Sequence, residues 1–360
     1  MKKKNKIVFV ISDLGIGGAQ KILLFLANFL EKKGFQVKIL YFGNKITIES
    51  NKEINFKSLG LNKKTNGIIE KIKYNLFRIK VLRQEIKKIK PDYLISFLTT
   101  VNILVLIASY NLKSKIILNE RNDVIRKEIP RVWKILRYFL YRFSNNVVTN
   151  QPESFNYLKK YIPSKKVLFI PNPLTNKEKY KYKKKRHKNI LFVGRLTFQK
   201  NIDILIRGFY KSEAIKKGWK LFIFGEGEEL KNLKHNIKTL KINNYVYVKG
   251  VTKKITKWYK KSSIYVICSR YEGMPNTLIE SMYYRLAIIG SNIPGIKYYI
   301  KHNKNGLLID NQREDHLIKS LNLLINNKKL RDQLGSNAKK YLIEKANPSF
   351  FFNKWLKILK

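Results

Sequence analysis

Apolar positions along the chain follow two alternating spacings. Short runs of β-branched and aromatic residues, typical of buried strands, are separated by longer stretches whose apolar residues recur every three or four positions, as in amphipathic helices. This alternation predicts the α/β class, with parallel sheets covered by helices. In the first half we expect helices near 19–33 and 101–111 and strands at 7–11, 36–42, 93–98, 116–118 and 146–149.

A second series of the same kind follows the turn-rich segment Ile170-Pro-Asn-Pro-Leu174 and a charged run over 176–188. Such segments mark domain junctions. We therefore expect two doubly wound domains, residues 1–172 and 173–345, with a C-terminal helix at 346–360 that packs back on the first. In the second domain, strands are expected at 189–193, 219–224, 245–249, 264–268 and 287–290.

The segment 269–281 carries two carboxylates eight positions apart, Glu272 and Glu280, around a strand-to-helix turn that Pro275 fixes. A helix start offers free N–H groups and the positive end of its dipole to a phosphate, and carboxylates accept hydrogen bonds from sugar hydroxyls. The segment thus predicts a sugar-nucleotide site. For Glu280 the alternative is structural, because Thr277 and Glu280 also have the spacing of a capping box.

The first strand ends in a glycine-rich loop that opens directly into a helix. Its glycines Gly15, Gly17 and Gly18 suggest phosphate binding on backbone N–H groups. A dinucleotide fingerprint is disfavoured, because Gln20 stands where the third glycine is needed and the second strand ends without the acid that binds ribose. A tight turn alone remains the alternative interpretation.

Two loops of the second domain also carry charge at predicted strand ends. Arg195 directly follows a strand and Lys200 precedes the next helix, so both cations are expected at the ligand-binding edge. Gly225 and Gly227 flank Glu226 after another strand, where they would let a ligand approach the backbone. The acids of that loop equally suit a helix N-terminus.

Composition limits the classes of function. The chain has 360 residues, of which 44% are hydrophobic, enough for two ordered domains. Its net charge of +51, from 75 Lys and Arg against 24 Asp and Glu, would suit nucleic acid or an anionic membrane. The cations are spread along the whole chain, however, and the abundance of Lys, Asn and Ile is typical of a protein encoded by an A/T-rich gene. We therefore expect no nucleic acid partner.

The rare residue types indicate location and chemistry. A single cysteine, Cys268, excludes an internal disulfide and favours the cytoplasm. No secretion signal is evident, and the most apolar stretch, 93–110, is too polar to span a membrane. The four histidines lack metal-ligand spacing, so neither a metal nor a cofactor is expected.

Taken together, these loops resemble the family 4 glycosyltransferases of GT-B fold, the group 1 glycosyl transferases, over essentially the whole chain. The resemblance implies two facing Rossmann-like domains with an interdomain cleft, and a retaining, metal-independent transfer from a nucleotide-diphosphate sugar. The features that carry it are Gly15-Ile-Gly-Gly18, Gly194-Arg195 with Lys200, Gly225-Glu-Gly227, and the Glu-x7-Glu element Glu272–Glu280.

The resemblance also implies roles. Arg195 and Lys200 neutralise the departing diphosphate, and Glu272 binds donor sugar hydroxyls. The further donor-binding residues that we expect are Gly15, Gly17, Gly18, Gly225, Glu226, Asn276, Thr277, Leu278 and the ribose-binding Glu280.

In the loop that corresponds to residues 119–123, many members have a histidine close to the transferred sugar. This chain reads Glu-Arg-Asn there instead. In this it resembles members similar to N-acetylgalactosaminyltransferases of surface-glycan assembly. Arg121 and Asn122 are expected to contact the sugar or the acceptor. Arginine is not a base at neutral pH. The resemblance favours front-face attack by the acceptor hydroxyl, with the diphosphate oxygen taking the proton and electrostatic stabilisation of the leaving group dominating catalysis.

Two basic segments rich in apolar residues, 131–143 and 69–90, fit an anionic membrane surface, or else ordinary core helices with a solvated basic face. Membrane binding would bring the enzyme, as a peripheral protein on the inner face of the cytoplasmic membrane, to a polyprenyl-diphosphate-linked glycan. That acceptor suits the assembly of lipopolysaccharide, capsule or another surface polysaccharide. The expected donor is a UDP-sugar carrying a hexose or N-acetylhexosamine.

Two other functions remain open at this point. A polyanion- or RNA-binding protein without catalysis would depend on charge and would not use Glu272 or Glu280. A GT-B epimerase or phosphorylase would share the fold, but no feature of the sequence favours either. The sequence predicts no particular oligomeric state.

Overall fold

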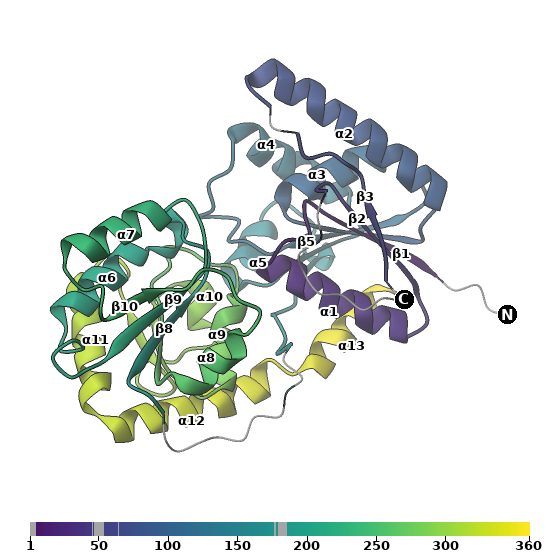
Figure 1. The fold of residues 1–360 in the computed structure, drawn as a ribbon. Helices are drawn as coiled ribbons and strands as arrows, with labels where there is room; N and C mark the ends of the chain where they lie inside the picture. The colour runs from purple at the N-terminus through teal and green to yellow at the C-terminus, as the bar shows by residue number, and fades with distance from the viewer. Residues whose placement is uncertain (1–4, 45, 47–53, 64, 176–177, 179–185) are drawn as a thin grey trace. The chain divides into compact units, whose positions relative to one another are not determined.

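The chain folds into two compact units in the computed structural model, which describes residues 5–44, 46, 54–63, 65–175, 178 and 186–360 (Figure 1). Unit 1 comprises Met1–Thr175 with Ser349–Lys360, and unit 2 comprises Asn176–Pro348. Each unit is a parallel sheet with helices on both faces, so the α/β class is confirmed. The charged run expected at the junction, 176–188, lies mostly outside the described residues.

Unit 1 contains a seven-stranded sheet in which all neighbouring strands are parallel, in the order β3-β2-β1-β4-β5-β6-β7. Its central strands are continuous apolar runs because both of their faces are buried. The strands are β1 (Lys6–Ile11), β2 (Gln36–Tyr41), β3 (Asn55–Ser58), β4 (Tyr93–Phe97), β5 (Lys115–Glu120), β6 (Asn146–Thr149) and β7 (Val167–Phe169).

Helices cover both faces of this sheet. Ile7 and Phe9 of β1 face a core formed with α1, whereas Val8 and Val10 face a core formed mainly with α2 and α3. The helices of the main part of unit 1 are α1 (Gly18–Lys32), α2 (Ile68–Ile89), α3 (Thr99–Ala108), α4 (Arg131–Leu140) and α5 (Pro152–Leu158), with short 3-10 turns η1 (Tyr141–Phe143) and η2 (Ser164–Lys166).

The last helix, α13 (Pro348–Ile358), belongs to unit 1 although the whole of unit 2 separates it from the other elements in sequence. Its Trp355 is fully buried beside α1, and Phe352 stacks on Phe29 of α1 at 3.7 Å between ring centroids. The hydroxyl of Tyr93 donates to the Leu359 carbonyl oxygen at 2.7 Å. The C-terminal segment therefore completes the unit 1 core.

Unit 2 is a six-stranded parallel sheet in the order β10-β9-β8-β11-β12-β13. The chain builds outward from β8 in one direction and then restarts at β11 on its other side. Its strands are β8 (Asn189–Val193), β9 (Lys220–Phe224), β10 (Val246–Val248), β11 (Ile264–Ile267), β12 (Ala287–Ser291) and β13 (Leu307–Ile309).

The helices of unit 2 bury one face of this sheet in a large aliphatic core and the other in a more aromatic layer. In that layer Trp258 lies against Phe222 and Phe224, at 4.5 and 5.1 Å between ring centroids. The helices are η3 (Phe198–Lys200), α6 (Ile202–Lys211), α7 (Leu230–Thr239), α8 (Ile255–Lys261), α9 (Asn276–Tyr283), α10 (Pro294–Lys297), α11 (Glu314–Asn326) and α12 (Lys328–Lys345). Among the described residues, no helix is both long and apolar enough to cross a membrane.

Candidate functional site

The predicted donor residues of unit 2 lie on loops that follow β8, β9 and β11, which are adjacent and parallel. All three loops therefore leave the same edge of the sheet. The position between β8 and β11 is also where the strand order reverses, which is the usual ligand-binding position of open α/β sheets. The fold brings together at this edge segments that are far apart in sequence.

An ion pair between Lys200 and Glu272 lies at this edge. Lys200 Nζ donates to Glu272 Oε1, and the two side chains are only 12% and 8% exposed. Ser269 Oγ donates to the same carboxylate oxygen at 2.7 Å, and Gln199 Nε2 lies 3.4 Å from Oε2. The predicted phosphate-binding cation and sugar-binding carboxylate thus share one buried position.

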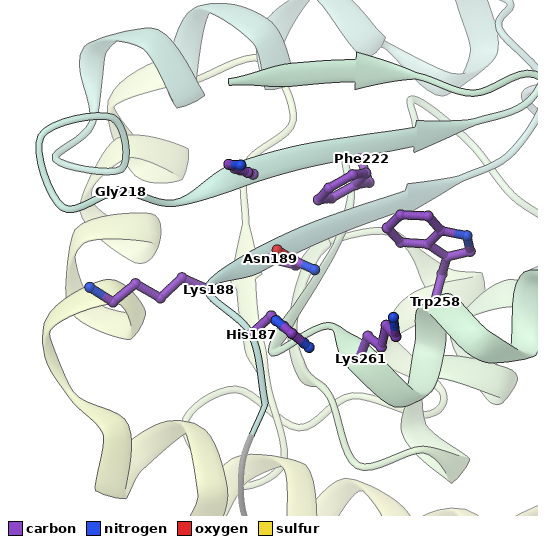
Figure 2. Close-up of a pocket in the computed structure, with 8 residues that line it drawn as sticks. His187, Lys188, Asn189, Gly218, Phe222, Trp258 and Lys261 are labelled. Carbon is purple, nitrogen blue, oxygen red and sulfur yellow. The ribbon is translucent and has the colours of Figure 1, made fainter. Parts of the chain in front are cut away.

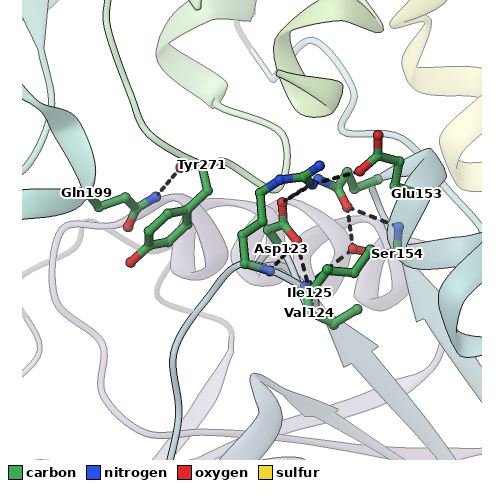
Figure 3. A network of polar contacts seen from close by, with 9 residues as sticks. Asp123, Val124, Ile125, Glu153, Ser154, Gln199 and Tyr271 are labelled. Atoms are coloured by element: carbon green, nitrogen blue, oxygen red, sulfur yellow. Dashed lines mark hydrogen bonds and ion pairs between the residues drawn. The ribbon is translucent and has the colours of Figure 1, made fainter. Parts of the chain in front are cut away.

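Further hydrogen bonds tie the two loops that carry this pair. The Arg270 amide donates to the Gln199 carbonyl oxygen at 2.8 Å, and Gln199 Nε2 donates to the Tyr271 carbonyl oxygen at 2.9 Å (Figure 3). The guanidinium of Arg270 lies over the Phe198 ring and donates to Asn201 Oδ1 at 2.7 Å. The loops are therefore held to each other by the chain itself.

The glycines after β9 lie against the backbone of the loop after β8, whereas we expected them to face a ligand. A Cβ atom at Gly225 would lie 1.8 Å from the Gly194 carbonyl oxygen, and one at Gly227 would lie 2.2 Å from the Leu196 carbonyl oxygen. Both also have positive φ angles, +148° and +155°. These glycines admit the backbone of the neighbouring loop, and the prediction that they admit a ligand finds no support in these contacts. Glu226 between them is exposed.

The capping-box interpretation of Glu280 is wrong. Helix α9 begins two residues earlier than that motif requires, with Pro275 as its N-cap, and Thr277 lies inside the first turn. The Thr277 hydroxyl instead accepts a hydrogen bond from the Tyr265 hydroxyl at 2.8 Å. Because a proline side chain has no hydrogen-bond acceptor, the N-cap residue forms no side-chain cap.

Glu280 instead lies near buried tyrosine hydroxyls. Burial raises the pKa of Tyr259 well above its usual value, and the charge of Glu280 adds to this. Burial likewise raises the pKa of Tyr265, and the negative charges of Glu272 and Glu280 raise it further. The charges of both ends of the Glu-x7-Glu element thus act on one buried hydroxyl.

The other predicted donor groups of unit 2 differ in availability. Arg195 is exposed, and within the described part of the chain it has no ion pair. The Leu278 amide donates to the Pro275 carbonyl oxygen at 3.2 Å, so it binds a phosphate only if that bond breaks. Asn276 is the first residue of α9 and is half-buried.

In unit 1, the glycine-rich loop is held by a carboxylate. Asp13 Oδ1 accepts hydrogen bonds from the Gly15 amide at 3.0 Å and from Gln20 Nε2 at 2.9 Å. Gln20 folds back over Gly17, where an added Cβ would lie 2.3 Å from its Oε1. Gly17 is the N-cap of α1, which begins at Gly18. The Gly15 amide thus donates to Asp13, and it binds a phosphate only if that bond breaks.

The loop after β5 is anchored through Asp123, whose side chain is buried. Its Oδ2 accepts from Arg126 Nη1 at 3.1 Å and from Gln151 Nε2 at 2.9 Å, and Arg126 also pairs with Glu153 at 2.7 Å (Figure 3). Gln151 in turn accepts from the Ser154 amide at 3.0 Å as the N-cap of α5. This network fixes the loop that carries the next two predicted residues.

Arg121 and Asn122 lie just ahead of that anchor. Arg121 is 7% exposed, donates from Nη1 to Asn172 Oδ1 at 2.7 Å, and lies over the Phe97 ring at 5.7 Å from its centroid. Burial lowers the pKa of Arg121 to about 9. Asn122 is half-buried. Their contacts with a sugar or an acceptor stay a prediction.

Comparison with known proteins agrees with this arrangement. The family model "Glycosyltransferase Family 4" matches residues 16–175, and "Glycosyl transferases group 1" matches residues 175–341. An uncharacterised glycosyltransferase of Haemophilus influenzae is 30% identical over 93% of this chain and 94% of its own length. The chain belongs to glycosyltransferase family 4.

Another relative of this glycosyltransferase is the GalNAc-alpha-(1->4)-GalNAc-alpha-(1->3)-diNAcBac-PP-undecaprenol alpha-1,4-N-acetyl-D-galactosaminyltransferase of Campylobacter jejuni, 29% identical over 98% of both chains. Among solved structures, a Staphylococcus aureus TarM mutant in complex with Fondaparinux, alpha-GlcNAc-glycerol and UDP is similar with a TM-score of 0.81. That likeness covers 99% of this chain and 100% of TarM at 14% identity. The GT-B fold is thus confirmed, and family membership identifies the chain as an enzyme rather than a charge-driven polyanion binder.

Sequence reasoning missed several residues that support the site. Ser269 and Gln199 bind the Glu272 carboxylate, and Asp13 binds the glycine loop. Gly295 of α10 lets the chain pass close to the Glu272 loop, since a Cβ there would lie 2.1 Å from the Gly273 carbonyl oxygen. Ser269 and Asp13 do follow strands at the ligand-binding edge, which was the one available signal.

A separate hollow of about 360 Å³ lies at the opposite end of the unit 2 strands, where β8 and β9 begin (Figure 2). It is distinct from the carboxyl edge that carries the predicted donor residues. The lining residues of the hollow are His187, Lys188, Asn189, Gly218, Lys220, Phe222, Trp258 and Lys261.

The part of the chain that the structure describes contains no group of three or more His, Cys, Asp or Glu arranged to hold a metal ion.

Proposed function

We propose that this glycosyltransferase moves a hexose or N-acetylhexosamine from a UDP-sugar to a lipid-linked glycan, with retention at the anomeric carbon and without a metal ion. The observation that carries the proposal is the buried Lys200–Glu272 pair at the strand-order reversal of unit 2. A cation suits the diphosphate and a carboxylate suits the sugar hydroxyls, and both groups stand at one position.

The donor is proposed from chemistry and from likeness together. Arg195 is an exposed cation on the loop that also carries Lys200, and electrostatic stabilisation of a departing diphosphate requires such charges. The similar TarM structure contains UDP. We propose that Arg195 and Lys200 bind the diphosphate, Glu272 the sugar and Glu280 the ribose, with the start of α9 at Asn276 and Thr277 near the phosphates.

In the proposed reaction, the bond between the anomeric carbon and the diphosphate oxygen breaks, and the acceptor hydroxyl forms a new bond on the same face of the sugar. The proton of that hydroxyl passes to the departing diphosphate oxygen. Arg121 contributes charge but no base, because a guanidinium, even with the pKa of about 9 that burial gives Arg121, stays protonated at pH 7.

The acceptor is proposed from the relatives. The Campylobacter jejuni enzyme extends a glycan carried on diphospho-undecaprenol, and the likeness covers nearly all of both chains. We propose the same class of acceptor here, a glycan on a polyprenyl diphosphate, in the assembly of a bacterial surface polysaccharide.

Membrane binding by unit 1 is part of the proposal. Helices α2 and α4 both pack against α3, so they lie on the same face of the sheet. The first half of α2, α4 and η1 keep large apolar side chains in solvent among many cations, which an ordinary core helix does not do. Those side chains are Ile68, Ile69, Ile72, Leu76, Phe77, Val132, Ile135, Tyr138, Phe139 and Phe143.

The donor and the reaction are tested with purified enzyme. UDP-, GDP- and ADP-sugars are screened by thermal stabilisation, and the UDP-sugar that stabilises is incubated with a polyprenyl-diphosphate-linked glycan, with and without EDTA. We expect a product whose anomeric configuration, read from its NMR coupling constant, matches the donor, at equal rates in both conditions. Stabilisation by none of the UDP-sugars would refute the donor, and an inverted product would refute the mechanism.

Membrane binding is tested separately by sedimentation with phosphatidylglycerol vesicles at low salt. The wild type should sediment with the vesicles. The double variant Ile69→Glu/Ile135→Glu should stay in the supernatant, because its apolar contacts with the lipid are lost. Failure of the wild type to bind would overturn the membrane proposal without affecting the reaction.

A further inference from the structure

The carboxyl edge of the unit 1 sheet contains buried polar side chains on an otherwise apolar face. Successive strand residues point to opposite faces. Ile117 of β5 belongs to the core beneath α1, so Asn119 and Arg121 share its face, whereas Glu120 points to the other. Asn119 is fully buried and Arg121 is 7% exposed.

The edge of the Arg121 guanidinium on this face has no partner. Nη1 donates to Asn172 Oδ1 at 2.7 Å, but Nε and Nη2 are buried without a hydrogen bond in the described part of the chain. The N–H groups of Nε and Nη2 point in the same direction from the planar guanidinium. Together they form the fork that binds two oxygens of one carboxylate or phosphate.

Among the residues that the structure describes, Arg121 also lacks a counter-charge. Arg137 is also buried, but there the charges of Glu120 and nearby tyrosines outweigh burial and raise the pKa. For Arg121, burial is the one cause of the shift, and it lowers the pKa. Glu120 lies on the opposite face, where it accepts hydrogen bonds from Tyr141 and from Thr99. A buried charge with no counter-ion is costly, and an anionic ligand would compensate it.

Asn119 adds a second group without a partner on the same face. Its side-chain oxygen and nitrogen are both buried and form no hydrogen bond within the described residues, and the side-chain oxygen of Asn150 is in the same condition. Asn150 Nδ2 donates to Asn172 Oδ1 at 3.2 Å, so Asn150, Asn172 and Arg121 form one cluster. Native proteins rarely leave several adjacent buried polar atoms unpaired.

We propose that Arg121 and Asn119 bind a diphosphate group at this edge, with Asn172 holding the guanidinium in place. The inference rests on the proposed function, in which both substrates, the nucleotide sugar and the lipid-linked acceptor, carry a diphosphate. A sugar hydroxyl would leave the buried charge of Arg121 uncompensated. In the glycine loop of unit 1, by contrast, the Gly15 amide already donates to Asp13.

The test measures binding without turnover. Affinities for inorganic diphosphate, UDP and farnesyl diphosphate are measured by calorimetry on the wild type, Arg121→Met and Arg121→Lys. Arg313→Met, which removes an exposed guanidinium paired with Asp315, is the control. We expect Arg121→Met to weaken binding of inorganic diphosphate and of at least one of the other two probes at least tenfold. Arg121→Lys, which keeps the charge and loses the fork, should weaken it severalfold, and the control should not change it.

The two organic probes distinguish the sources of the diphosphate. A loss for UDP alone assigns the site to the donor, and a loss for farnesyl diphosphate assigns it to the carrier lipid. Without any probe, Arg121→Met should melt no lower than the wild type, since it removes an uncompensated charge. A variant that binds all the probes as the wild type does would overturn the proposal, as would a lower melting temperature with unchanged affinity. If Arg121→Met does not fold, the affinity of Arg121→Lys decides alone.

The outcome is separable from that of the proposed function. A wild type that binds diphosphate through Arg121 but transfers no sugar would keep this subsite and refute the reaction. If the enzyme transfers sugar but its diphosphate affinity does not depend on Arg121, the reaction is kept and the subsite is refuted.

Discussion

Lys200 and Glu272 neutralise each other in a position that is almost closed to water. Removing one member of a buried ion pair leaves the other charge without compensation, which costs far more than an exposed pair contributes. Experiments can therefore separate the role of the pair in holding the loops of unit 2 together from its proposed role in binding substrate.

Stability variants isolate the first role. Lys200→Met and Glu272→Met should each lower the free energy of unfolding of unit 2 by about 3 kcal/mol. The double variant should cost at least about 1 kcal/mol less than the sum, because no lone charge remains. Urea unfolding measures all three. Strict additivity would show that the two side chains do not interact.

The buried tyrosines near the Glu-x7-Glu element make stability depend on pH. Burial raises the pKa of Tyr259 in the folded state, while an unfolded tyrosine ionises near pH 10. Above pH 10 the unfolded state thus binds fewer protons than the folded state, and stability falls as pH rises. Each such tyrosine contributes a slope of about 1.4 kcal/mol per pH unit.

Tyr259→Phe tests this. Between pH 10 and 12, the free energy of unfolding of the variant should fall less steeply than that of the wild type, by the slope of one tyrosine. Denaturant titrations at several pH values measure it. Identical slopes for both proteins would mean that Tyr259 titrates normally in the fold.

Some residues of the site were predictable from sequence and others were not. Lys200 and Glu272 follow strands at one edge of a parallel sheet, so their types and positions already indicated a common site. Ser269 and Asp13 support that edge through hydrogen bonds whose partners depend on loop conformation. Arg121 was expected at the site. That its Nε and Nη2 atoms are buried without a partner depends on the position of its side chain beside Asn172, which the sequence does not show.

At the scale of elements, the central strands were predicted within one or two residues because both of their faces are buried, which makes their sequences continuously apolar. The three strands that sequence reasoning missed, β3, β7 and β13, are short and lie at sheet edges. Such strands need fewer apolar residues, so their pattern is weak. The capping-box error arose because Pro275 starts α9 earlier than the side-chain pattern indicated.

The close contact between the β8 and β9 loops predicts a large effect for a small change. Gly225→Ala would place a Cβ 1.8 Å from the Gly194 carbonyl oxygen at a φ of +148°. We expect it to lower the free energy of unfolding of unit 2 by about 3 kcal/mol or more and to abolish sugar transfer.

Gly218→Ala is the matched control. Gly218 also has a positive φ, +69°, but an added Cβ would meet no atom within 4 Å. Backbone strain alone should cost about 1 kcal/mol. Equal costs for the two variants, measured by urea unfolding, would show that the loop contact is unimportant.

At the scale of the whole molecule, each unit has its own core, and the chain returns to unit 1 for its last helix. Because Trp355 of α13 is fully buried in the unit 1 core, Trp355→Ala should cost about 3–5 kcal/mol and lower the melting temperature of unit 1 while leaving that of unit 2 unchanged. Calorimetry that resolves the two transitions measures this.

Phe350→Ala, on the same helix, provides the comparison. Phe350 is exposed and carries the Lys354 ammonium over its ring, so its loss should cost less than about 1 kcal/mol. A similar small effect for Trp355→Ala would mean that α13 does not stabilise unit 1.

The central claim is that unit 2 binds and activates a nucleotide sugar through the Lys200–Glu272 edge. The most direct test is the rate of sugar transfer by the wild type, Glu272→Gln and Glu314→Gln. Glu314 is a carboxylate of the same unit that pairs with Arg207 and Lys211 away from the loops of the site. We predict that Glu272→Gln lowers kcat by about 10²- to 10³-fold and that Glu314→Gln leaves it unchanged. A Glu272→Gln enzyme that transfers sugar at the wild-type rate would contradict the account.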